Sequence, residues 1–406
     1  MLGMEKSDIT QLRADPAVPV RSPVGELPSP LRVAFLSGEL THGGAEKQLV
    51  YMAGALHASG VCVRVYALGE GVSYQAALGD AGLSPIVVGR AASPLLRLIA
   101  FARALRHFRP HIVQAAQFYV NLYVALVSRF YGSLAIGAIR GDGVRDLRNL
   151  GRWGPLSLRA PSALVTNSHK ARHTAIGLGI SSAKIHVVAN VIDAAVFDRA
   201  SRSRLAARTP GQAVAILVGQ LIRAKRVDRF LEALALARRS TPELRGAVVG
   251  DGPERVSLEA LAGRLGLLPD GVEFRGVSDD IPRLMAEAHM LALTSDHEGF
   301  PNVILEAMAA RLPVITTPAG DSAVVIEDGV SGFVVPFDDS SELADRLIRL
   351  ARSPALRREL GEAAYERVIV RYTCRGLADQ LLAVYRAAAQ RTGHRGVLGH
   401  LPPVST

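Results

Sequence analysis

The chain of 406 residues is long enough for two domains of ordinary size, each with its own core. Hydrophobic residues make up 49% of it and charged residues 21%, a balance that excludes wholesale disorder. The two cysteines, Cys62 and Cys374, are far apart and lack metal-type spacing. We therefore expect a reducing compartment and no disulfide framework.

The termini and the most apolar stretch favour a soluble, cytoplasmic chain. Residues 118–139 carry Arg129 and are interrupted by Gly132, which argues against a transmembrane helix. The N-terminus is polar and rich in proline, unlike a signal peptide. We expect a disordered leader over residues 1–30 and a disordered tail over residues 393–406.

The net charge of +10 is unevenly distributed. Residues 1–200 hold 21 basic and 12 acidic side chains, a balance of +9, and the remainder holds 26 and 25, a balance of +1. No acidic residue lies between Asp80 and Asp142. The arginines in this interval are Arg90, Arg97, Arg103, Arg106, Arg109, Arg129 and Arg140. One interpretation is a basic face that binds anionic lipid or a phosphorylated acceptor. The other is a solvated basic surface without a ligand.

Two observations limit this interpretation. On a helical wheel over residues 95–109 the arginines scatter, so a helix lying flat on a membrane is not clearly indicated. The basic residues also lack interleaved aromatic residues, so we expect no binding of nucleic acid.

Short apolar strands alternate with amphipathic stretches along the chain. In the first half, strands are expected over residues 31–37, 61–68, 84–89, 110–116, 134–139, 162–168 and 184–190. A helix over residues 43–60 follows the first of these. The pattern restarts after a polar passage, with strands expected over residues 213–219, 245–252, 272–276, 290–295, 313–317 and 332–337.

Apolar strands linked by helical crossovers predict α/β domains with doubly wound parallel sheets, and the restart predicts two of them. The predicted segments are a first domain over residues 31–200, a linker over 201–212 and a second domain over 213–373, followed by a helix over 374–392 that packs back on the first domain. Ligands of open parallel sheets bind beyond the carboxyl ends of the strands. The residues that follow each strand are therefore the candidates for chemistry.

The first strand is followed by Gly43 and Gly44, which precede a helix. Paired glycines let the backbone approach a ligand and let free amides face an anion, although a simple tight turn also uses them. In the second half, Arg223 and Lys225 follow the strand at the start of a helix. Cations beside helix amides suit a diphosphate, although both side chains could be solvated loop cations.

The stretch HEGFPNVILEAMAA, residues 297–310, places Glu306 inside an apolar run that predicts a buried helix. Glu298 falls at the end of the preceding strand, and the helix is expected to start at Pro301 or Asn302. Its first amides would face an anion. Glu306 could accept hydrogen bonds from a ribose diol and Glu298 from a second polyol. The alternative is a buried salt bridge at Glu306 with a solvated Glu298.

EGFPNVILE, residues 298–306, resembles the E-x7-E motif of retaining glycosyltransferases of the GT-B fold, often called glycosyltransferase family 4. Six further landmarks follow the family's order over residues 31–390. They are GGAEK near the start, VTNS at Val165–Ser168, NVID at Asn190–Asp193, VGQL with Lys225, VVGDGPER at Val248–Arg255 and EDGVSGFVVPFDD at Glu327–Asp339.

The resemblance implies two Rossmann-like domains that face each other across a cleft, with a nucleotide-diphosphate sugar bound by the second half and a glycan or lipid-linked acceptor by the first. Lys225 would contact the diphosphate, Glu306 the ribose and Glu298 the transferred sugar, with Lys225 and Glu298 as catalytic residues. The further donor-binding residues implied are Gly219, Gln220, Arg223, Gly299, Phe300, Pro301, Asn302 and Val303. Gly43 and Gly44 would lie on the diphosphate and acceptor side.

The family generally needs no metal or other cofactor, and no convincing DxD-type set occurs here. The pairs Asp279-Asp280 and Asp338-Asp339 are expected to be loop residues with surface roles. Envelope or exopolysaccharide synthesis in bacteria, with peripheral contact to the inner membrane face, is the biological setting that the resemblance and the basic first half suggest.

Two positions depart from the family pattern. Gln220 stands where an arginine is frequent, so diphosphate binding would depend on Lys225 and Arg223. Arg140 stands where a catalytic histidine is frequent. Arg140 could hold a phosphate and Asp142 could face the acceptor, or the two could form a turn contact.

Three other classes of protein stay open at this stage. A GT-B sugar-nucleotide epimerase would share the two-domain architecture, and so would a catalytically inactive nucleotide-sugar-binding subunit. A periplasmic-type sugar-binding protein also has two α/β lobes, but the expected absence of a signal peptide counts against it. The side chains of the loop at residues 276–280 do not indicate which base or sugar the donor carries.

Overall fold

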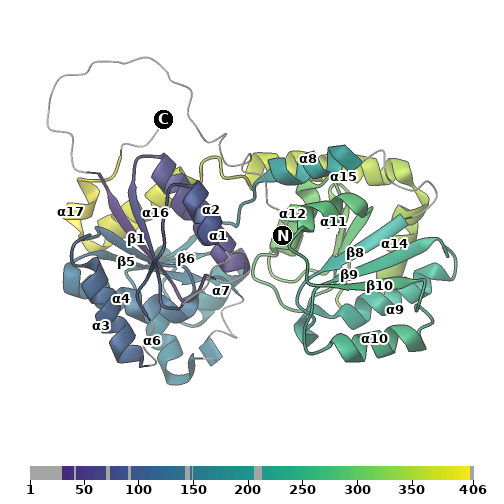
Figure 1. Cartoon of the computed structure of the whole chain (residues 1–406), viewed down its shortest axis with the longest axis horizontal. Helices are drawn as coiled ribbons and strands as arrows, with labels where there is room; N and C mark the ends of the chain where they lie inside the picture. Colours follow the sequence, from purple (N-terminus) through teal and green to yellow (C-terminus); the bar gives the residue numbers. More distant parts are fainter. Residues whose placement is uncertain are drawn as a thin grey trace, which may run out of the picture. The chain divides into compact units, whose positions relative to one another are not determined.

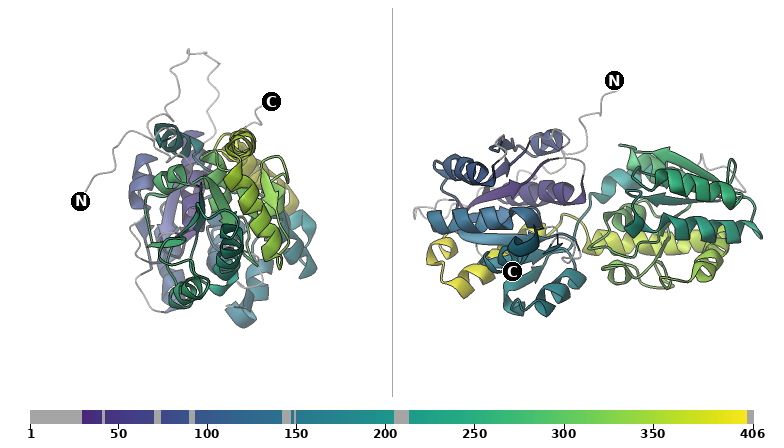
Figure 2. Two further views of the ribbon diagram at one scale, coloured as in Figure 1. Left: turned by 90° about the vertical axis from the view of Figure 1, so that its right-hand side faces the viewer. Right: turned by 90° about the horizontal axis from the view of Figure 1, so that it is seen from below.

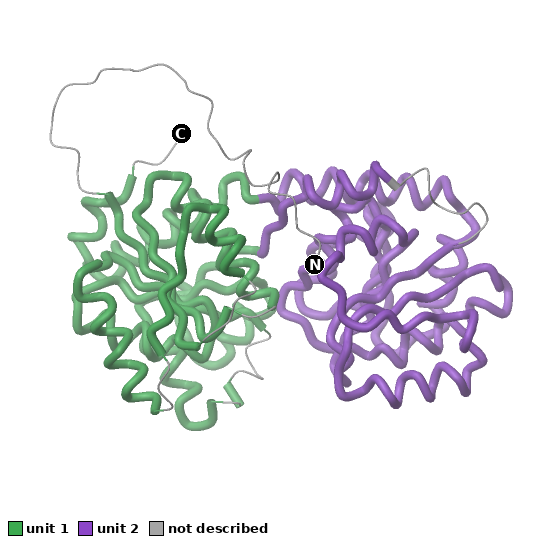
Figure 3. The backbone as a smooth tube through the Cα atoms, in the orientation of Figure 1, with its two compact units in different colours: residues 1–189, 374–406 green, residues 190–373 purple. Residues whose placement is uncertain are grey.

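The computed structural model describes residues 30–40, 43–69, 74–89, 93–141, 147–148, 150–204 and 213–402. The chain divides into two compact units (Figure 3). The first unit comprises residues 1–189 together with 374–406, and the second comprises residues 190–373. The first unit is therefore built from both ends of the chain.

The first unit holds a parallel sheet of seven strands in the order β3-β2-β1-β4-β5-β6-β7. The strands are β1 (Arg32–Ser37), β2 (Cys62–Ala67), β3 (Ile86–Val87), β4 (Ile112–Ala115), β5 (Leu134–Ile139), β6 (Ala163–Thr166) and β7 (Ile185–Val187). All seven expected strands of the first half are confirmed. Every residue of β5 is buried, as expected for a strand with helices on both faces of its sheet.

The helices of the first unit cover both faces of this sheet (Figure 1). They are α1 (Gly44–Ala58), α2 (Gln75–Asp80), α3 (Pro94–Leu105), α4 (Asn121–Tyr131), α6 (Gly154–Arg159), α7 (His169–Gly177), α16 (Leu377–Thr392) and α17 (Arg395–Leu398). Helix α16 packs against α1 on one face, and α3 and α4 pack together on the other. In α16 the hydroxyl of the buried Tyr385 donates a hydrogen bond to Gln114 of β4.

The second unit holds a six-stranded parallel sheet in the order β10-β9-β8-β11-β12-β13. The strands are β8 (Ala213–Val218), β9 (Leu244–Val249), β10 (Val272–Gly276), β11 (Met290–Leu293), β12 (Val314–Thr316) and β13 (Gly332–Val334). The six strands expected in the second half are therefore also confirmed. In both sheets the strand order reverses beside a central strand, β1 or β8, which is where doubly wound folds bind ligands.

Helices again cover both faces of the second sheet (Figure 2). They are α8 (Ala194–Arg204), α9 (Val227–Arg238), α10 (Arg255–Arg264), α11 (Ile281–Glu287), α12 (Asn302–Ala309), α13 (Ser322–Val325), α14 (Ser340–Arg352) and α15 (Pro354–Arg371). An apolar cluster of this unit lies between the sheet and α9, α10 and α14, with Phe230 and Leu234 fully buried. The rigid sheet therefore fixes where its carboxyl-end loops begin.

The boundary between the units differs from the expected one. Helix α8 occupies part of the predicted linker and packs on α11 and α12, so the second unit begins at Asn190 and not after residue 212. The amide of Ile192 donates a hydrogen bond of 2.8 Å to the carbonyl of Tyr372. The two points where the chain enters and leaves the second unit are thus joined, a long-range pairing that no local pattern reveals.

The prediction of a disordered tail from Gly393 is also wrong over residues 393–402. Residues 393–402 are structured, α17 packs on α16, and the side chain of Val397 is buried. The composition of residues 393–402 does not predict this packing, because it depends on the surface of α16. No helix in the described part of the chain is long and apolar enough to cross a membrane.

Candidate functional site

The turn between β11 and α12 is organised as the sequence predicts. Helix α12 begins at Asn302, with Pro301 as its N-cap residue and no side-chain cap. The first amides of a helix have no intrahelical acceptor, so this N-terminus is suited to an anion. Asn190 donates a hydrogen bond of 2.7 Å from its Nδ2 to Oδ1 of Asn302 and thereby orients that side chain.

Glu306 lies one turn into α12. Its side chain is half-buried, as are those of Asn302 and Val303, whereas the residues between them are buried. The expected buried helix is confirmed, but the Glu306 carboxylate itself is not fully buried. The helix turns a partly exposed face outward at these three positions, and this placement avoids most of the cost of burying a charge. Phe300, in the preceding turn, is buried and packs on Tyr372.

Lys225 and Glu298 form an ion pair, with 2.5 Å between Nζ and Oε1. Lys225 ends the 3-10 turn η6 (Arg223–Lys225), which follows β8, and Glu298 follows β11, the neighbouring strand. The hydroxyl of Ser295 donates a second hydrogen bond of 2.7 Å to the same carboxylate oxygen. The side chains of Lys225 and Glu298 are only 23% and 11% exposed, so Lys225 is not a solvated loop cation.

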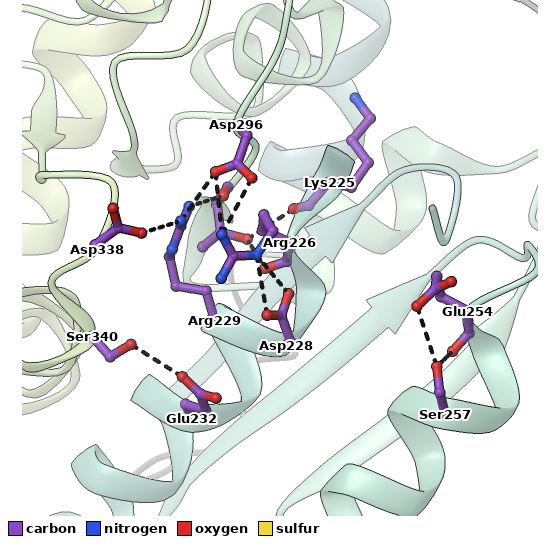
Figure 4. A network of polar contacts seen from close by, with 11 residues as sticks. Lys225, Arg226, Asp228, Arg229, Glu232, Glu254, Ser257, Asp296, Asp338 and Ser340 are labelled. Carbon is purple, nitrogen blue, oxygen red and sulfur yellow. Dashed lines mark hydrogen bonds and ion pairs between the residues drawn. The ribbon is translucent and has the colours of Figure 1, made fainter. Parts of the chain in front are cut away.

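A network of ion pairs joins the segment after β8 to the segment after β11 (Figure 4). Asp296 accepts contacts from Arg226 at 3.2 Å and from Arg229 at 3.0 Å, and Arg229 also contacts Asp338 at 3.1 Å. The side chain of Arg229 is only 2% exposed, so this cation depends on its carboxylate and carbonyl partners. Lys225 extends away from this network in Figure 4, which leaves its ammonium to Glu298.

The η6 turn is also tied to β11 through its backbone. The amide of Asp296 donates to the carbonyl of Ala224 at 2.9 Å, and the hydroxyl of Thr294 donates to the carbonyl of Arg226 at 2.8 Å. Arg226 has a φ of 49°, in the left-handed region that a non-glycine residue seldom adopts. Because backbone and ion pairs both fix this turn, Lys225 is held in place before any ligand arrives.

A hollow of about 600 Å³ opens beside the turn, a volume within the range of small-molecule sites. Its walls come from η6, from the first turn of α9 and from one side of α10 along its whole length. The lining residues are Ile222, Arg223, Arg226, Val227, Asp228, Glu254, Ser257, Leu258, Leu261, Arg264 and Asp296. Arg223, predicted as a donor-binding residue, thus faces a different space from Lys225.

Gly219 and Gln220 continue β8 toward η6. The amide of Gly219 donates to the carbonyl of Val249 at 3.0 Å, and a Cβ at Gly219 would lie 3.6 Å from the Lys225 side chain. Gln220 is exposed, and its carbonyl accepts a hydrogen bond from Ile222. The backbone around Gly219 therefore lies close to Lys225.

Gly320 closes the turn from the other side and was not anticipated from the sequence. Its φ is 59°, and a Cβ there would lie 2.4 Å from the carbonyl oxygen of Gly299 and 2.6 Å from that of Glu298. The amide of the next residue, Asp321, donates to the Gly299 carbonyl at 3.1 Å. Only a residue without a Cβ allows this approach.

We expect Gly320→Ala to lower the free energy of unfolding by about 2 kcal/mol or more, because it combines left-handed strain with a backbone clash. Urea unfolding measures the effect. Gly329→Ala is the matched control, since Gly329 has a φ of 75° but no atom within 4 Å of its Cβ position. Equal losses in the two variants would contradict a specific role of Gly320 in holding the 298–299 turn.

The first unit carries a polar cluster at the carboxyl ends of β1 and β4. Gly43 caps α1, and a Cβ there would lie 2.1 Å from the carboxylate of Glu46. Glu46 accepts a hydrogen bond of 2.7 Å from Gln117, whose Oε1 in turn accepts from the amide of Gly38 at 3.1 Å. The absence of a Cβ at Gly43 therefore leaves room for the Glu46 carboxylate. Gly44 is the first residue of α1.

Glu46 and Gln117 were missed in the sequence. Glu46 lies two positions after the glycine pair, and Gln117 directly follows the strand expected over residues 110–116. These positions are the signal that could have identified them. Tyr119 lies in the same cluster, and burial together with the charges of Glu46 and Glu39 raises its pKa to about 12. The hydroxyl of Tyr119 therefore stays protonated at neutral pH.

Arg140 follows β5 at the same edge of the first sheet. One guanidinium nitrogen contacts the Met52 sulfur at 3.2 Å, and Nε is buried without a hydrogen-bond partner among the described residues. Burial lowers the pKa of Arg140 to about 10, so the side chain is still a cation at neutral pH. The backbone carbonyl of Arg140 accepts from Asn167 at 2.9 Å. Asp142 lies outside the described residues, so neither of its two predicted roles is tested.

Three of the four aspartates considered for metal binding have other partners. Asp338 pairs with Arg229, and Asp339 and Asp280 cap α14 and α11 through hydrogen bonds to backbone amides. Over the described ranges, no three His, Cys, Asp or Glu residues come together as a metal site would require.

Both halves of the chain match family models. Residues 42–196 match "Glycosyltransferase Family 4", and residues 199–367 match "Glycosyl transferases group 1". The two matches are adjacent and together span most of both units. The chain belongs to the group 1 glycosyltransferases.

Curated relatives of this chain include alpha-D-kanosaminyltransferase of Streptomyces kanamyceticus, 33% identical over 43% of the chain and 45% of the relative. Another is N-acetyl-alpha-D-glucosaminyl L-malate synthase of Bacillus anthracis, 28% identical over 59% of the chain and 62% of the relative. The chain thus aligns with about half of the length of these relatives.

Solved structures show the same fold. HepE of Anabaena in complex with UDP-glucose superposes with a TM-score of 0.75 over 90% of the chain and 100% of HepE, at 22% identity. With two α/β units that hold parallel sheets of seven and six strands, the chain has the GT-B fold. The resemblance seen in the sequence is confirmed for family and fold.

Proposed function

We propose that the chain transfers a sugar, with retention of anomeric configuration and without a metal, from a nucleotide-diphosphate sugar to a hydroxyl of a glycan or lipid-linked acceptor. The observation that carries this proposal is the Lys225–Glu298 pair at the carboxyl end of the second sheet, beside the α12 N-terminus. The related HepE fold with bound UDP-glucose supports a nucleotide-sugar donor.

Each group has a task that its chemistry suits. Lys225 and the first amides of α12 bind the diphosphate, where a fixed cation and helix amides act together. Glu306, on the partly exposed face of α12, accepts the two hydroxyls of the ribose. Glu298 accepts a hydroxyl of the transferred sugar, and its bond to Ser295 keeps the carboxylate oriented. Because Gln220 is neutral, position 220 provides no second cation for the diphosphate.

In the proposed reaction the acceptor oxygen forms a bond to the anomeric carbon while the bond from that carbon to the diphosphate oxygen breaks, on the same face of the sugar. The acceptor proton passes to the departing phosphate oxygen, so no separate general base is required. Negative charge grows on the diphosphate as the bond breaks. Lys225 is already held by the η6 turn, so it stabilises this charge without reorganisation.

The first unit is proposed to hold the acceptor. The Glu46–Gln117 pair offers acceptors and donors for sugar hydroxyls. The Nε of Arg140, which has no hydrogen-bond partner within the described residues, suits a phosphate group. A lipid-linked acceptor would carry such a phosphate.

Peripheral contact with an anionic membrane is proposed for the α3–α4 surface. Leu95 is 64% exposed and Leu96 54%, both on α3, and Leu126 is 49% exposed on α4. Exposed apolar side chains among arginines suit a lipid interface. Leu95→Ser/Leu96→Ser should weaken binding to anionic vesicles, and unchanged co-sedimentation would contradict the contact.

The stereochemical course of transfer tests the proposed reaction. The purified protein is given the matching donor and a panel of alcohol and glycan acceptors, and proton NMR follows the anomeric signals. We expect nucleoside diphosphate to appear with a glycoside that keeps the anomeric configuration of the donor. A glycoside of inverted configuration would contradict the proposal. Free epimer without acceptor would favour an epimerase, and tight donor binding without turnover an inactive subunit.

A further inference from the structure

A second hollow, of about 430 Å³, lies at the amino-terminal edge of the first sheet. Its floor is formed where β1, β4 and β5 begin, and α17 with the residues around it forms a wall. It is therefore at the edge opposite the carboxyl ends of these strands, where Gly43, Gln117 and Arg140 lie. The lining residues are Arg32, Arg109, Pro110, His111, Phe130, Tyr131, Gly132, His394, Gly396, Val397 and His400.

The charge of this hollow is one-sided. Two guanidinium groups and three imidazoles line it, and none of the described lining residues is a carboxylate. The Nε of Arg32 donates a hydrogen bond of 2.9 Å to the carbonyl of Arg109, which fixes the Arg32 guanidinium at the floor. Arg109 is exposed and has a φ of 45°, a strained conformation for a side chain of this size. Cations without a counter-charge attract an anion.

His111 is held in one tautomer. The backbone amide of Arg32 donates a hydrogen bond of 3.1 Å to Nδ1 of His111, so Nδ1 is unprotonated and Nε2 carries the proton. Burial, followed by the charges of Arg32 and His400, lowers the pKa of His111 to about 4. At neutral pH the ring is therefore a neutral donor. It stacks on His400 with 3.9 Å between ring centroids, a contact that joins β4 to the C-terminal segment.

We propose that this hollow is an anion site that binds a phosphate group. Arg109 and Arg32 supply the charge, and the Nε2–H of His111 and the imidazole of His400 supply further hydrogen bonds. The phosphate belongs either to the headgroup of an anionic phospholipid or to a soluble phosphate ester. The site is independent of the proposed glycosyl transfer, since it uses no residue of the transfer site.

One feature of the rim bears on the source of the phosphate. Phe130, at the end of α4, is 79% exposed beside the hollow. An exposed aromatic ring next to a phosphate site is suited to the boundary between lipid headgroups and acyl chains. A soluble ester would not need this ring.

The test uses the whole chain and two double variants. Arg109→Ala/His400→Ala removes one guanidinium and one imidazole from the hollow. Arg395→Ala/His57→Ala removes the same two groups from exposed positions of the same unit outside it. Calorimetric titration with inorganic phosphate is expected to show binding that weakens at least about fivefold in the first variant and not in the second. Phosphate bound elsewhere on the protein contributes to both titrations, so the difference between the two variants reports binding in the hollow.

Vesicle flotation distinguishes the two sources. Vesicles of phosphatidylcholine with phosphatidylglycerol are compared with phosphatidylcholine alone. If the hollow variant loses both phosphate affinity and binding to the anionic vesicles, the site holds a lipid headgroup. If it loses phosphate affinity alone, the ligand is a soluble ester.

Two outcomes overturn the proposal. The first is equal weakening in both variants, which would reflect net charge alone. The second is the absence of saturable phosphate binding in the unaltered protein. Thermal unfolding of both variants checks that the loss of the His111–His400 stack has not unfolded the segment. If it has, Arg109→Ala alone, on a residue exposed to solvent, gives the same comparison.

Discussion

Replacing Lys225 by alanine is expected to lower sugar transfer at least about tenfold, because a charge-assisted contact to a diphosphate contributes ~1.5–3 kcal/mol. Affinity for the nucleoside diphosphate should fall by a similar factor, whereas affinity for the nucleoside alone should not change. Lys225 is the only lysine among residues 190–373, so no neighbouring ammonium can replace it. Calorimetry with the two ligands and donor-consumption assays measure these effects.

A control is needed because Lys225→Ala also removes the partner of Glu298, a carboxylate that is 11% exposed. Lys225→Ala/Glu298→Gln removes both charges and so relieves this defect. If Lys225 binds the diphosphate, the double variant regains thermal stability but not affinity for nucleoside diphosphate. Recovery of that affinity would mean that Lys225 serves only to neutralise Glu298.

Replacing Glu306 by alanine is expected to weaken binding of the nucleoside diphosphate by about ten- to a hundredfold, since hydrogen bonds from two ribose hydroxyls to a carboxylate are lost. The 2′-deoxy nucleotide provides the decisive comparison. The unaltered protein should prefer the ribonucleotide, and the Glu306→Ala variant should bind the two with nearly equal affinity. Direct titration of both nucleotides measures this loss of discrimination.

Glu366→Ala is the matched control, because Glu366 is exposed on α15 of the same unit. It should leave both affinities unchanged. Persistence of the ribose preference in Glu306→Ala would show that the diol is recognised elsewhere and would remove Glu306 from the proposed site.

The strands and the start of α12 could be predicted because each has a local cause. An apolar run such as LAIGAI is buried on both faces whatever its neighbours are, and Pro301 favours a helix start by fixing its own φ. The glycine pair at Gly43 and Gly44 could likewise be recognised without knowing what approaches it.

The features that were wrong or missed depend on contacts between distant parts of the chain. The unit boundary depends on the pairing of Ile192 with Tyr372, and the structured C-terminus on the stack of His111 with His400. The ion pair of Lys225 with Glu298 joins residues 73 positions apart. Such partners become neighbours only when the strand order is fixed, which sequence periodicity does not give.

A thermal-shift screen tests whether the second unit binds a nucleotide-diphosphate sugar. UDP, GDP, ADP and their common sugar conjugates are each added to the unaltered protein and to Glu306→Ala. A ligand that binds only the folded state raises the melting temperature by mass action. We expect one base series to raise the melting temperature of the unaltered protein and to raise that of the variant much less. No shift with any of these nucleotides would contradict this binding.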